Sequence, residues 1–428
     1  MKNISFLFLF YLATFQINAQ DLYFPPNFSE EWETIGNIEL NWCEENINNF
    51  NTFLEESNTN ACIVLKDGKI AHESYFNDFD LTTSWYWASA GKSLTAAMVG
   101  ILQDEGVLDI DDLTSDYLGE GWTSCNSGGE SKITIRNQLT MTSGLDYTVD
   151  DIYCIEPDCL FCLNEPNEEW FYHNAPYTLL ADVMEAALDQ NYTGITNSKL
   201  TNKIGFLGLW TKVNTGRLFF SKARGMARYG LLMLNEGDWN GEVIIEDKNY
   251  LQDMISTSQE INKSYGYLWW LNGKESFRLP GTTITFPGNI MPNAPDDLYA
   301  AIGKNGQILM VVPSQNLIIV RMGNNPDNSL VPINYIRNLW DEYEKLTCAV
   351  STESVDKVQF TVRPKLVWKN VEIITNQDFQ NVFVYDLKGN KIISSTTKIL
   401  DLSGLSRGMY FIQVSKGNKS STQKIIKI

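Results

Sequence analysis

The chain has 428 residues, enough for one large domain and a smaller module, and its composition is that of a folded protein rather than a disordered one. Its 33 Lys and Arg residues are outnumbered by 52 Asp and Glu residues, which gives a formal net charge of −19. This acidic balance excludes nucleic acid as the expected partner, because phosphate binding needs clustered Lys and Arg. It also disfavours docking to an anionic membrane surface.

The N-terminus has the pattern of a secretory signal peptide. Lys2 precedes an apolar run at 6–12, and a short polar stretch follows at 16–19. We expect residues 1–19 to be removed on export. The apolar run is too short to span a bilayer, and no later stretch is long enough, so no membrane span is expected after signal removal.

The charge balance changes near residue 350, which divides the chain into two modules. Residues 1–350 hold 21 Lys and Arg against 46 Asp and Glu, whereas residues 351–428 hold 12 against 6. The polar stretch at the junction is typical of a linker. The expected organisation is a large domain, a linker and a small domain, at 20–348, 349–356 and 357–428.

In the large domain, the hydrophobic pattern predicts strands near both ends and helices between them. The first predicted element is a hairpin of two strands, 61–65 and 70–75. The predicted helices follow at 89–103, 177–188 and 220–234. The predicted later strands are 299–301, 307–312 and 317–322. This order indicates an α/β or α+β fold in which the two ends share one sheet.

The small domain shows short β patterns separated by turn signals, which predicts a small β-sandwich. The patterns lie at 371–375, 382–385, 391–394 and 410–414.

Seven cysteines are consistent with an exported protein, since disulfides persist in oxidising compartments. They are Cys43, Cys62, Cys125, Cys154, Cys159, Cys162 and Cys348. We expect disulfides in preference to a zinc site, because zinc knuckles usually show paired CxxC units. Inert buried thiols are a third alternative, and the odd count leaves at least one thiol free.

The strongest functional signal is a serine followed three residues later by a lysine, Ser89 and Lys92, at the start of a helical pattern. Residues three apart on a helix share a face, so the two side chains can meet. A hydroxyl becomes a nucleophile when a neighbouring base takes its proton, and a desolvated lysine can be that base. Alone the pattern is weak, because an N-cap serine and a solvated lysine have the same spacing.

A second signal is Tyr172 with Asn174. A phenol beside a lysine ammonium can be partly deprotonated and can relay protons, and an amide two residues later can hold a substrate carbonyl. The alternative is a loop tyrosine packed before a helix.

A third signal is the turn Lys304-Asn305-Gly306-Gln307, which leads into a strand. The lysine supplies positive potential for a substrate carboxylate or a transition state, and the glycine lets substrate approach the backbone. The N–H of Gln307 can pair with that of Ser89 as an oxyanion hole. The alternative is an ordinary polar turn between strands.

In this order the three elements resemble the serine β-lactamase and penicillin-binding superfamily. Tyr172-x-Asn174 in place of Ser-Asp-Asn is the pattern of class C β-lactamases and their esterase, DD-peptidase and amide-hydrolase relatives. Further similarity lies in the segments 139–145, 223–230 and 265–270. The resemblance spans roughly residues 55–345. It implies a β-lactamase-like antiparallel sheet flanked by helices, with a helical subdomain.

The resemblance also implies roles. Ser89 would be the acylated nucleophile, Lys92 and Tyr172 would share the general-base and relay work, and Asn174 and Lys304 would contact substrate. No metal or organic cofactor is implied. Asn305 stands where threonine is usual, which weakens the case for a β-lactam carboxylate site. The run 300–307, followed by 311–314, resembles the esterase and 6-aminohexanoate-oligomer hydrolase side more than a true β-lactamase.

The tail has its own resemblance. The segments 382–389, 400–403, 408–412 and 424–428 resemble the C-terminal sorting domain of type IX secretion. This implies the type IX machinery as a partner, passage across a Gram-negative outer membrane, and a secreted or cell-surface location. An accessory β-domain that binds carbohydrate or cell wall is the alternative.

Other catalytic arrangements are weaker. His72 and His173 are the candidate bases for a Ser-His-Asp triad, and the GxSxG match at 404–408 lies in the β-rich tail, without the strand–turn–helix context that it requires. The sequence therefore predicts a secreted serine hydrolase that cleaves an amide or ester bond of a small or peptide-like substrate. The alternatives are a catalytically idle protein that binds peptidoglycan or β-lactams, and a surface-interaction protein.

Overall fold

The structure of the chain is a computed structural model that describes residues 22–126, 128–214, 216–326, 329, 331–348, 358–417 and 419–428. The predicted signal peptide and the predicted linker at 349–356 lie outside the described residues. The chain divides into two compact units, 1–347 and 348–428. In the described part of the chain, no helix is both long and apolar enough to cross a bilayer.

The large unit is built on a six-stranded sheet with the order β2-β1-β13-β12-β11-β8, in which each neighbouring pair is antiparallel. The strands are β1 (Thr59–Lys66), β2 (Lys69–Tyr75), β8 (Trp270–Leu271), β11 (Tyr299–Gly303), β12 (Gln307–Val312) and β13 (Leu317–Gly323). β1, from the start of the unit, pairs with β13, from its end, so that Ile63 lies opposite Val320. The prediction that the two ends share one sheet is confirmed.

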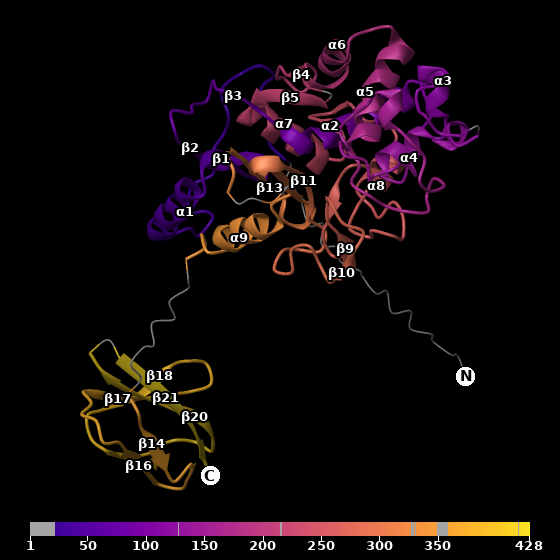
Figure 1. Ribbon diagram of the computed structural model, residues 1–428. Coiled ribbons are helices and arrows are strands. Elements are labelled where there is room, and N and C mark those ends of the chain that lie inside the picture. The colour runs from indigo at the N-terminus through magenta and orange to yellow at the C-terminus, as the bar shows by residue number, and fades with distance from the viewer. Residues whose placement is uncertain are drawn as a thin grey trace, which may run out of the picture. The chain divides into compact units, whose positions relative to one another are not determined.

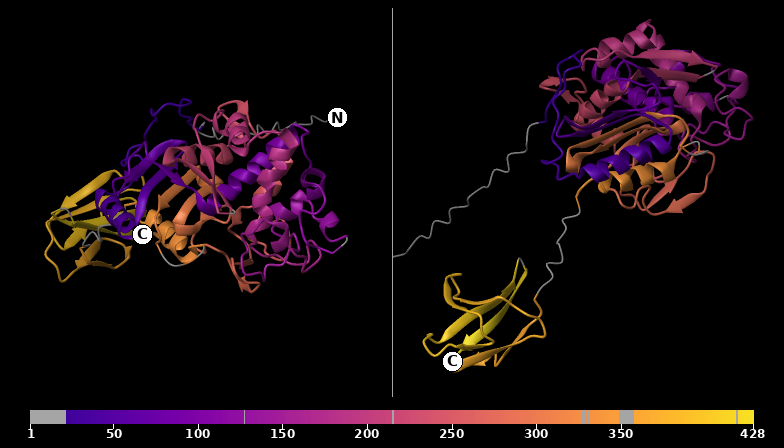
Figure 2. Two further views of the ribbon diagram at one scale, coloured as in Figure 1. Left: turned by 45° about the horizontal axis from the view of Figure 1, so that its top comes forward. Right: turned by 90° about the vertical axis from the view of Figure 1, so that its left-hand side faces the viewer.

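Helices cover both faces of this sheet (Figures 1 and 2). One face carries α1 (Glu44–Glu56) and α9 (Ile333–Glu344), and the other carries α2 (Gly91–Asp104) and α7 (Ala223–Leu234). α7 packs closely on the strands, because a Cβ added at Gly230 would lie 2.7 Å from Leu309 Cδ1. With both faces covered, β12 and β13 are buried at every residue and read as continuous hydrophobic runs.

The remaining elements of the large unit form a helical region and smaller sheets beside the main sheet (Figure 1). The helices are α3 (Thr114–Leu118), α4 (Ile135–Leu139), α5 (Asn174–Leu188), α6 (Tyr192–Thr196) and α8 (Lys248–Met254). The strands are β3 (Ser84–Tyr86), β4 (Leu209–Val213), β5 (Gly216–Lys222), β6 (Asp238–Trp239), β7 (Glu242–Val243), β9 (Ser276–Arg278) and β10 (Thr285–Pro287).

All three predicted helix starts differ from the observed ones. The helix predicted from 177 begins earlier, at Asn174, and the other two begin later. The helix predicted from 220 begins at Ala223, because Phe220 pairs with Leu209 and Tyr86 in the sheet β3-β5-β4. The helix predicted from Ser89 begins at Gly91, after a 3₁₀ turn at Ala88–Ala90. In both places, contacts with distant segments override the local helical pattern.

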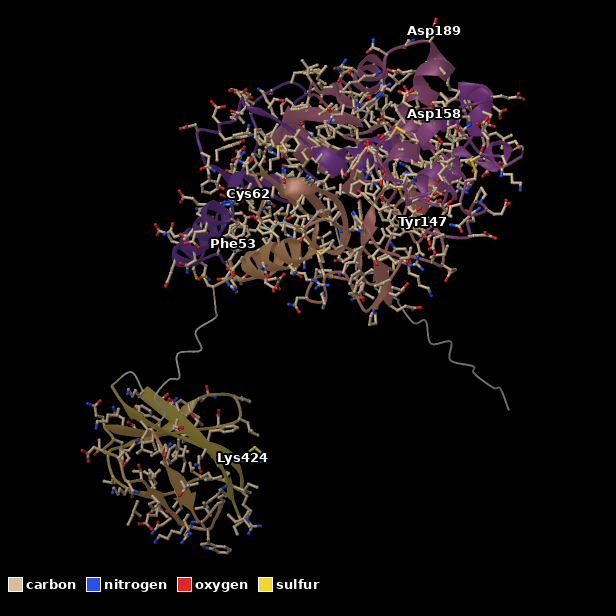
Figure 3. All side chains as sticks on the ribbon, viewed as in Figure 1. Phe53, Cys62, Tyr147, Asp158, Asp189 and Lys424 are labelled. Atoms are coloured by element: carbon tan, nitrogen blue, oxygen red, sulfur yellow. A yellow bond between two sulfur atoms is a disulfide. The ribbon has the colours of Figure 1, made fainter. Side chains whose placement is uncertain are left out.

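The cysteines form disulfides, as the sequence analysis predicted. Cys125 is bonded to Cys162 and Cys154 to Cys159. Cys43 and Cys348 are also disulfide-bonded. Cys62, labelled in Figure 3, is a free and buried thiol whose pKa burial raises to about 12. The Cys154–Cys159 bond closes the short loop that carries the labelled Asp158.

The small unit is a β-sandwich of two sheets with the orders β14-β16-β19 and β15-β21-β20-β17-β18. Its strands are β14 (Thr361–Arg363), β15 (Leu366–Val367), β16 (Asn370–Ile374), β17 (Asn381–Tyr385), β18 (Lys391–Ser395), β19 (Ile399–Asp401), β20 (Gly408–Lys416) and β21 (Lys419–Lys427). The four predicted strands correspond to β16, β17, β18 and β20. Val371, Val382 and Ile412 are fully buried in its core.

Candidate active site

Ser89 lies in the tight turn that leads into α2, and its side chain is partly exposed to solvent. Trp87 anchors this turn: its backbone N–H donates to Phe219 O at 2.8 Å and its indole N–H donates to Ser221 Oγ at 2.9 Å. Ala88 has a φ of +45°, a left-handed conformation that costs energy in a residue with a Cβ. Strain of this kind persists where the surrounding structure holds it, which is common at functional sites.

Lys92 meets Ser89 directly, as the three-residue spacing predicted. Its Nζ donates to Ser89 Oγ at 2.9 Å and to Asn174 Oδ1 at 2.9 Å. Both partners are neutral, and the lysine side chain is only 2% exposed. Burial lowers the pKa of Lys92 well below its usual value, because removal from water penalises the charged form. A neutral amine at this position can accept a proton from the serine.

Tyr172 completes the group around the Ser89 hydroxyl. It lies just before α5, is 2% exposed, and stacks on Trp270 with 5.7 Å between ring centres. Burial raises the pKa of its phenol above the usual value, and a hydrogen bond with the Ser89 side chain lowers it in part. Burial therefore favours the neutral phenol, whereas a neighbouring ammonium would favour partial deprotonation. The expected ammonium beside it is itself disfavoured by burial.

Within the turn 304–306, Asn305 and Gly306 make hydrogen bonds inside the fold, whereas Lys304 faces solvent. The Asn305 side chain donates to the hydroxyl of Tyr86 at 2.7 Å. Arg321, which is fully buried, donates to the backbone carbonyls of Asn305 at 2.7 Å and Gly306 at 2.9 Å. These contacts hold the hairpin between β11 and β12, so the turn has a structural explanation that needs no substrate.

Gln307 does not have the place that the oxyanion prediction needs. It begins β12, which lies between β11 and β13, so its backbone faces a neighbouring strand on either edge. Its side chain donates to Gly323 O at 2.7 Å and accepts from Gly323 N at 3.1 Å. A backbone N–H must face an open edge to donate to a substrate oxygen. Because an interior strand has no open edge, this position does not favour the oxyanion role predicted for the Gln307 N–H.

The site residues predicted from the sequence do not include Ile302 and Gly303 of β11, which adjoin the Ser89 turn. A Cβ added at Gly303 would lie 2.5 Å from Trp87 O and 3.0 Å from Ala90 N, so the strand and the turn are in close contact. On the open edge, Asn272 N–H donates to Leu298 O, and Ala300 pairs with Trp270. Because every second residue of an antiparallel strand faces the same edge, Ile302 also faces this edge, beyond the end of β8. A glycine ending an apolar strand was the available signal.

Replacement of Gly303 by alanine is expected to lower kcat by roughly 10- to 100-fold, because the new methyl group must displace the turn that carries Ser89. Backbone strain plays no part, since Gly303 has a φ of −120°. Gly36→Ala is the matched control, because a Cβ there meets nothing within 4 Å. Steady-state kinetics of both variants make the comparison, and unchanged kcat in Gly303→Ala would show that the contact is not needed for activity.

Neither histidine has the surroundings of a catalytic base. His72 lies on β2 and its Nε2 contacts Ser74 Oγ at 3.0 Å. His173 is buried, and burial lowers the pKa of each histidine to about 4. Among the residues that the structure describes, no cluster of His, Cys, Asp and Glu has the arrangement of a metal site.

Comparison with known families agrees with this geometry. The family profile for beta-lactamase matches residues 58–337, about two thirds of the chain. The chain belongs to the beta-lactamase family. Members of this family are generally serine hydrolases, and the large unit has the family's fold of an antiparallel sheet with helices on both faces.

Individual relatives are distant. This beta-lactamase family member is 24% identical over 271 residues to an uncharacterised protein of Alkalihalophilus pseudofirmus, which covers 57% of this chain and 74% of that one. It is 30% identical over 163 residues to Protein flp of Staphylococcus aureus, which covers 33% of this chain and 32% of Protein flp.

Solved structures show the same fold. A putative 6-aminohexanoate-dimer hydrolase from Bacillus anthracis aligns with a TM-score of 0.55 at 19% identity, covering 69% of this chain and 81% of that one. A putative beta-lactamase from Bacteroides dorei aligns with a TM-score of 0.56 at 13% identity, covering 72% and 99%. A family VIII carboxylesterase aligns with a TM-score of 0.52 at 14% identity, covering 71% and 97%.

The small unit is also identified. The profile for the secretion system C-terminal sorting domain matches residues 366–428, which confirms the prediction from the tail sequence. The domain indicates that type IX secretion exports the protein to the cell surface or beyond it.

Proposed function

We propose that the large unit is a secreted serine hydrolase that cleaves an ester or amide bond through an acyl-enzyme on Ser89. The observation that carries the proposal is the 2.9 Å hydrogen bond from the buried Lys92 amine to the partly exposed Ser89 hydroxyl. Burial of a lysine without a carboxylate partner destabilises a folded protein. Because this lysine contacts a solvent-accessible hydroxyl, a catalytic role would explain its presence here.

In the first half of the proposed reaction, Ser89 Oγ bonds to the substrate carbonyl carbon while its proton passes to Lys92 Nζ. The carbonyl electron pair moves onto the substrate oxygen. When the tetrahedral intermediate collapses, the proton reaches the leaving oxygen or nitrogen through the Tyr172 phenol, which can donate one proton and receive another. Water then attacks the acyl-enzyme by the same proton path and releases the acid.

The oxyanion of the tetrahedral intermediate needs two donors beside the reacting carbon. The proposed donors are the backbone N–H groups of Ser89 and Ile302, the second of which replaces Gln307 in this role. Ile302 faces the open edge of β11 next to the Ser89 turn, where an N–H can meet a ligand. Asn174 uses its amide oxygen to orient Lys92, and its amide nitrogen is the proposed contact to substrate.

The proposed substrate is uncharged near the cleaved bond. Ala300, Ala301 and Ile302 form the strand next to Ser89 and are all apolar and buried, while Lys304 is exposed at the turn beyond them. A substrate carboxylate placed against these buried apolar residues would be desolvated, which is unfavourable. An ester or an amide oligomer is therefore favoured over a β-lactam or a D-Ala-D-Ala peptide.

Covalent labelling tests the proposal. The full chain is treated with a fluorophosphonate, digested, and mapped by mass spectrometry, and we expect one adduct on the peptide that contains Ser89. A panel of nitrocefin, p-nitrophenyl esters, D-Ala-D-Ala peptides and short amide oligomers is then assayed, with esters or amide oligomers expected to react fastest. Labelling at another residue would overturn the assignment. Stable acylation without turnover would favour the idle binding protein.

A further inference from the structure

Lys92 contacts a second aromatic ring that the proposed reaction does not use. Its Nζ lies 4.0 Å from the centre of the Tyr177 ring and 4.9 Å from that of the Tyr172 ring. Tyr177 follows Asn174 by three residues on the first turn of α5, so both side chains lie on the helix face that meets Lys92. The tyrosine is 7% exposed.

Among the described residues, no charged group is paired with Lys92. Burial is the cause that lowers the pKa of Lys92. Arg217 of β5 acts on the Tyr177 phenol, and its guanidinium is itself held by Asp182 and Glu185. The other titratable groups coupled to Tyr172 or Tyr177 are phenols. Those of Tyr192 and Tyr265 are buried and that of Tyr153 is exposed.

We propose that Tyr177 is a positioning residue for Lys92, and that the face of its ring stabilises the ammonium group that forms when Lys92 takes the Ser89 proton. The inference rests on the hydrolytic function proposed above. An aromatic ring carries negative charge density on its face, and its attraction for a cation grows where water is excluded. The ring forms and breaks no bond: the proton moves only from Ser89 Oγ to Lys92 Nζ.

The first test compares Tyr177→Leu, which removes the ring, with Tyr177→Phe, which keeps it. Loss of the ring disfavours the ammonium form and lowers the pKa of Lys92. The acidic limb of the kcat/KM profile should therefore move down by about one pH unit, and the plateau of kcat/KM above that limb should fall by up to roughly tenfold. Tyr177→Phe should stay within about twofold at every pH. A Tyr177→Leu profile that superimposes on that of Tyr177→Phe would overturn the inference.

A second series of variants at position 177 controls for the cavity that Tyr177→Leu would leave. Phenylalanine, 4-fluoro-, 3,5-difluoro- and 3,4,5-trifluorophenylalanine are placed at position 177, which weakens the negative face of the ring in steps at nearly constant shape. The acidic limb should move down in the same order. A limb that stays fixed across the series, with unchanged thermal stability, would show that the ring acts through packing alone.

The third measurement does not depend on activity. In a Ser89→Ala background, the pKa of Lys92 is followed by ¹³C NMR of the labelled lysine Cε, with the signal assigned by its absence in Lys92→Met. We expect the pKa of Lys92 to fall by about one unit in Tyr177→Leu and to change little in Tyr177→Phe. Equal values in both variants would overturn the role of Tyr177 even if the enzyme proves active. A protein without hydrolytic activity would overturn the proposed function and leave this measurement valid.

Discussion

Replacement of Ser89 by alanine is expected to lower kcat/KM for every ester or amide substrate by at least about 10³-fold. The change removes the single oxygen that bonds to the substrate carbonyl, while Trp87 and α2 still hold the turn. Covalent labelling by a fluorophosphonate or a penicillin should disappear as well. Steady-state kinetics with a p-nitrophenyl ester and intact-protein mass spectrometry measure the two effects.

Ser93→Ala is the matched control for this variant. Ser93 lies one turn further along α2, and its hydroxyl is fully buried and donates to Ala90 O at 2.7 Å. Its loss should lower the free energy of unfolding by about 1 kcal/mol and leave kcat/KM within a few-fold of the native value. Full activity in Ser89→Ala, or equal losses in the two variants, would contradict the assignment of the nucleophile.

Replacement of Lys92 by methionine is expected to have opposite effects on activity and stability. Removal of the general base should lower kcat/KM by about 10²- to 10⁴-fold. Methionine has a similar length and no charge, and the side chain at this position is only 2% exposed. Its burial should therefore raise the free energy of unfolding by about 1–3 kcal/mol, because the desolvation of an amine is removed.

The stability gain should depend on pH in a direction that the shifted pKa fixes. The pKa of Lys92 is lowered in the folded state, whereas an unfolded lysine titrates near 10.4. Between these two values the unfolded chain binds one proton more than the folded chain, so native stability at this site rises with pH. The advantage of Lys92→Met should thus be largest below the folded pKa and should disappear above about pH 10.4.

Urea unfolding of both proteins at several pH values between 6 and 10.5 measures this difference. A gain that is constant across the range would show that methionine improves packing without relieving a charge. A variant that is less stable at every pH would contradict the view that the Lys92 amine is kept in its buried place for catalysis.

The two-residue core of the site was predictable because it is local. Only three positions separate Ser89, in the 3₁₀ turn Ala88–Ala90, from Lys92, in the first turn of α2, so the chain itself keeps the two side chains close together. Tyr172 lies 80 residues after Lys92 in the sequence, and the spacing alone does not place its phenol near Ser89. The role of Tyr172 was predicted from the order of the motifs. Its contact with Ser89 depends on how the segment before α5 packs against α2.

The turn at 304–307 shows where sequence patterns fail. Lysine, asparagine and glycine in that order suit a substrate-binding loop and a hairpin turn equally well. The sheet order favours the hairpin reading for Gln307, since β12 is an interior strand and the edge next to Ser89 belongs to β11. Ile302 and Gly303 have no reactive side chain that a sequence motif could reveal. Ile302 would contribute only a backbone N–H, and Gly303 allows the strand to lie close to the Ser89 turn.

The amino-acid sequence alone determined the division into two modules, the shared sheet, the disulfide chemistry, the family of the large unit and the sorting tail. These follow from hydrophobic periodicity, charge and short motifs, which are local properties of the chain. Only the tertiary structure decided the burial of Tyr172, the contacts of Lys92 with two aromatic rings and the strand beside the nucleophile. Burial and strand order depend on which distant segments pack together, and no local pattern specifies them.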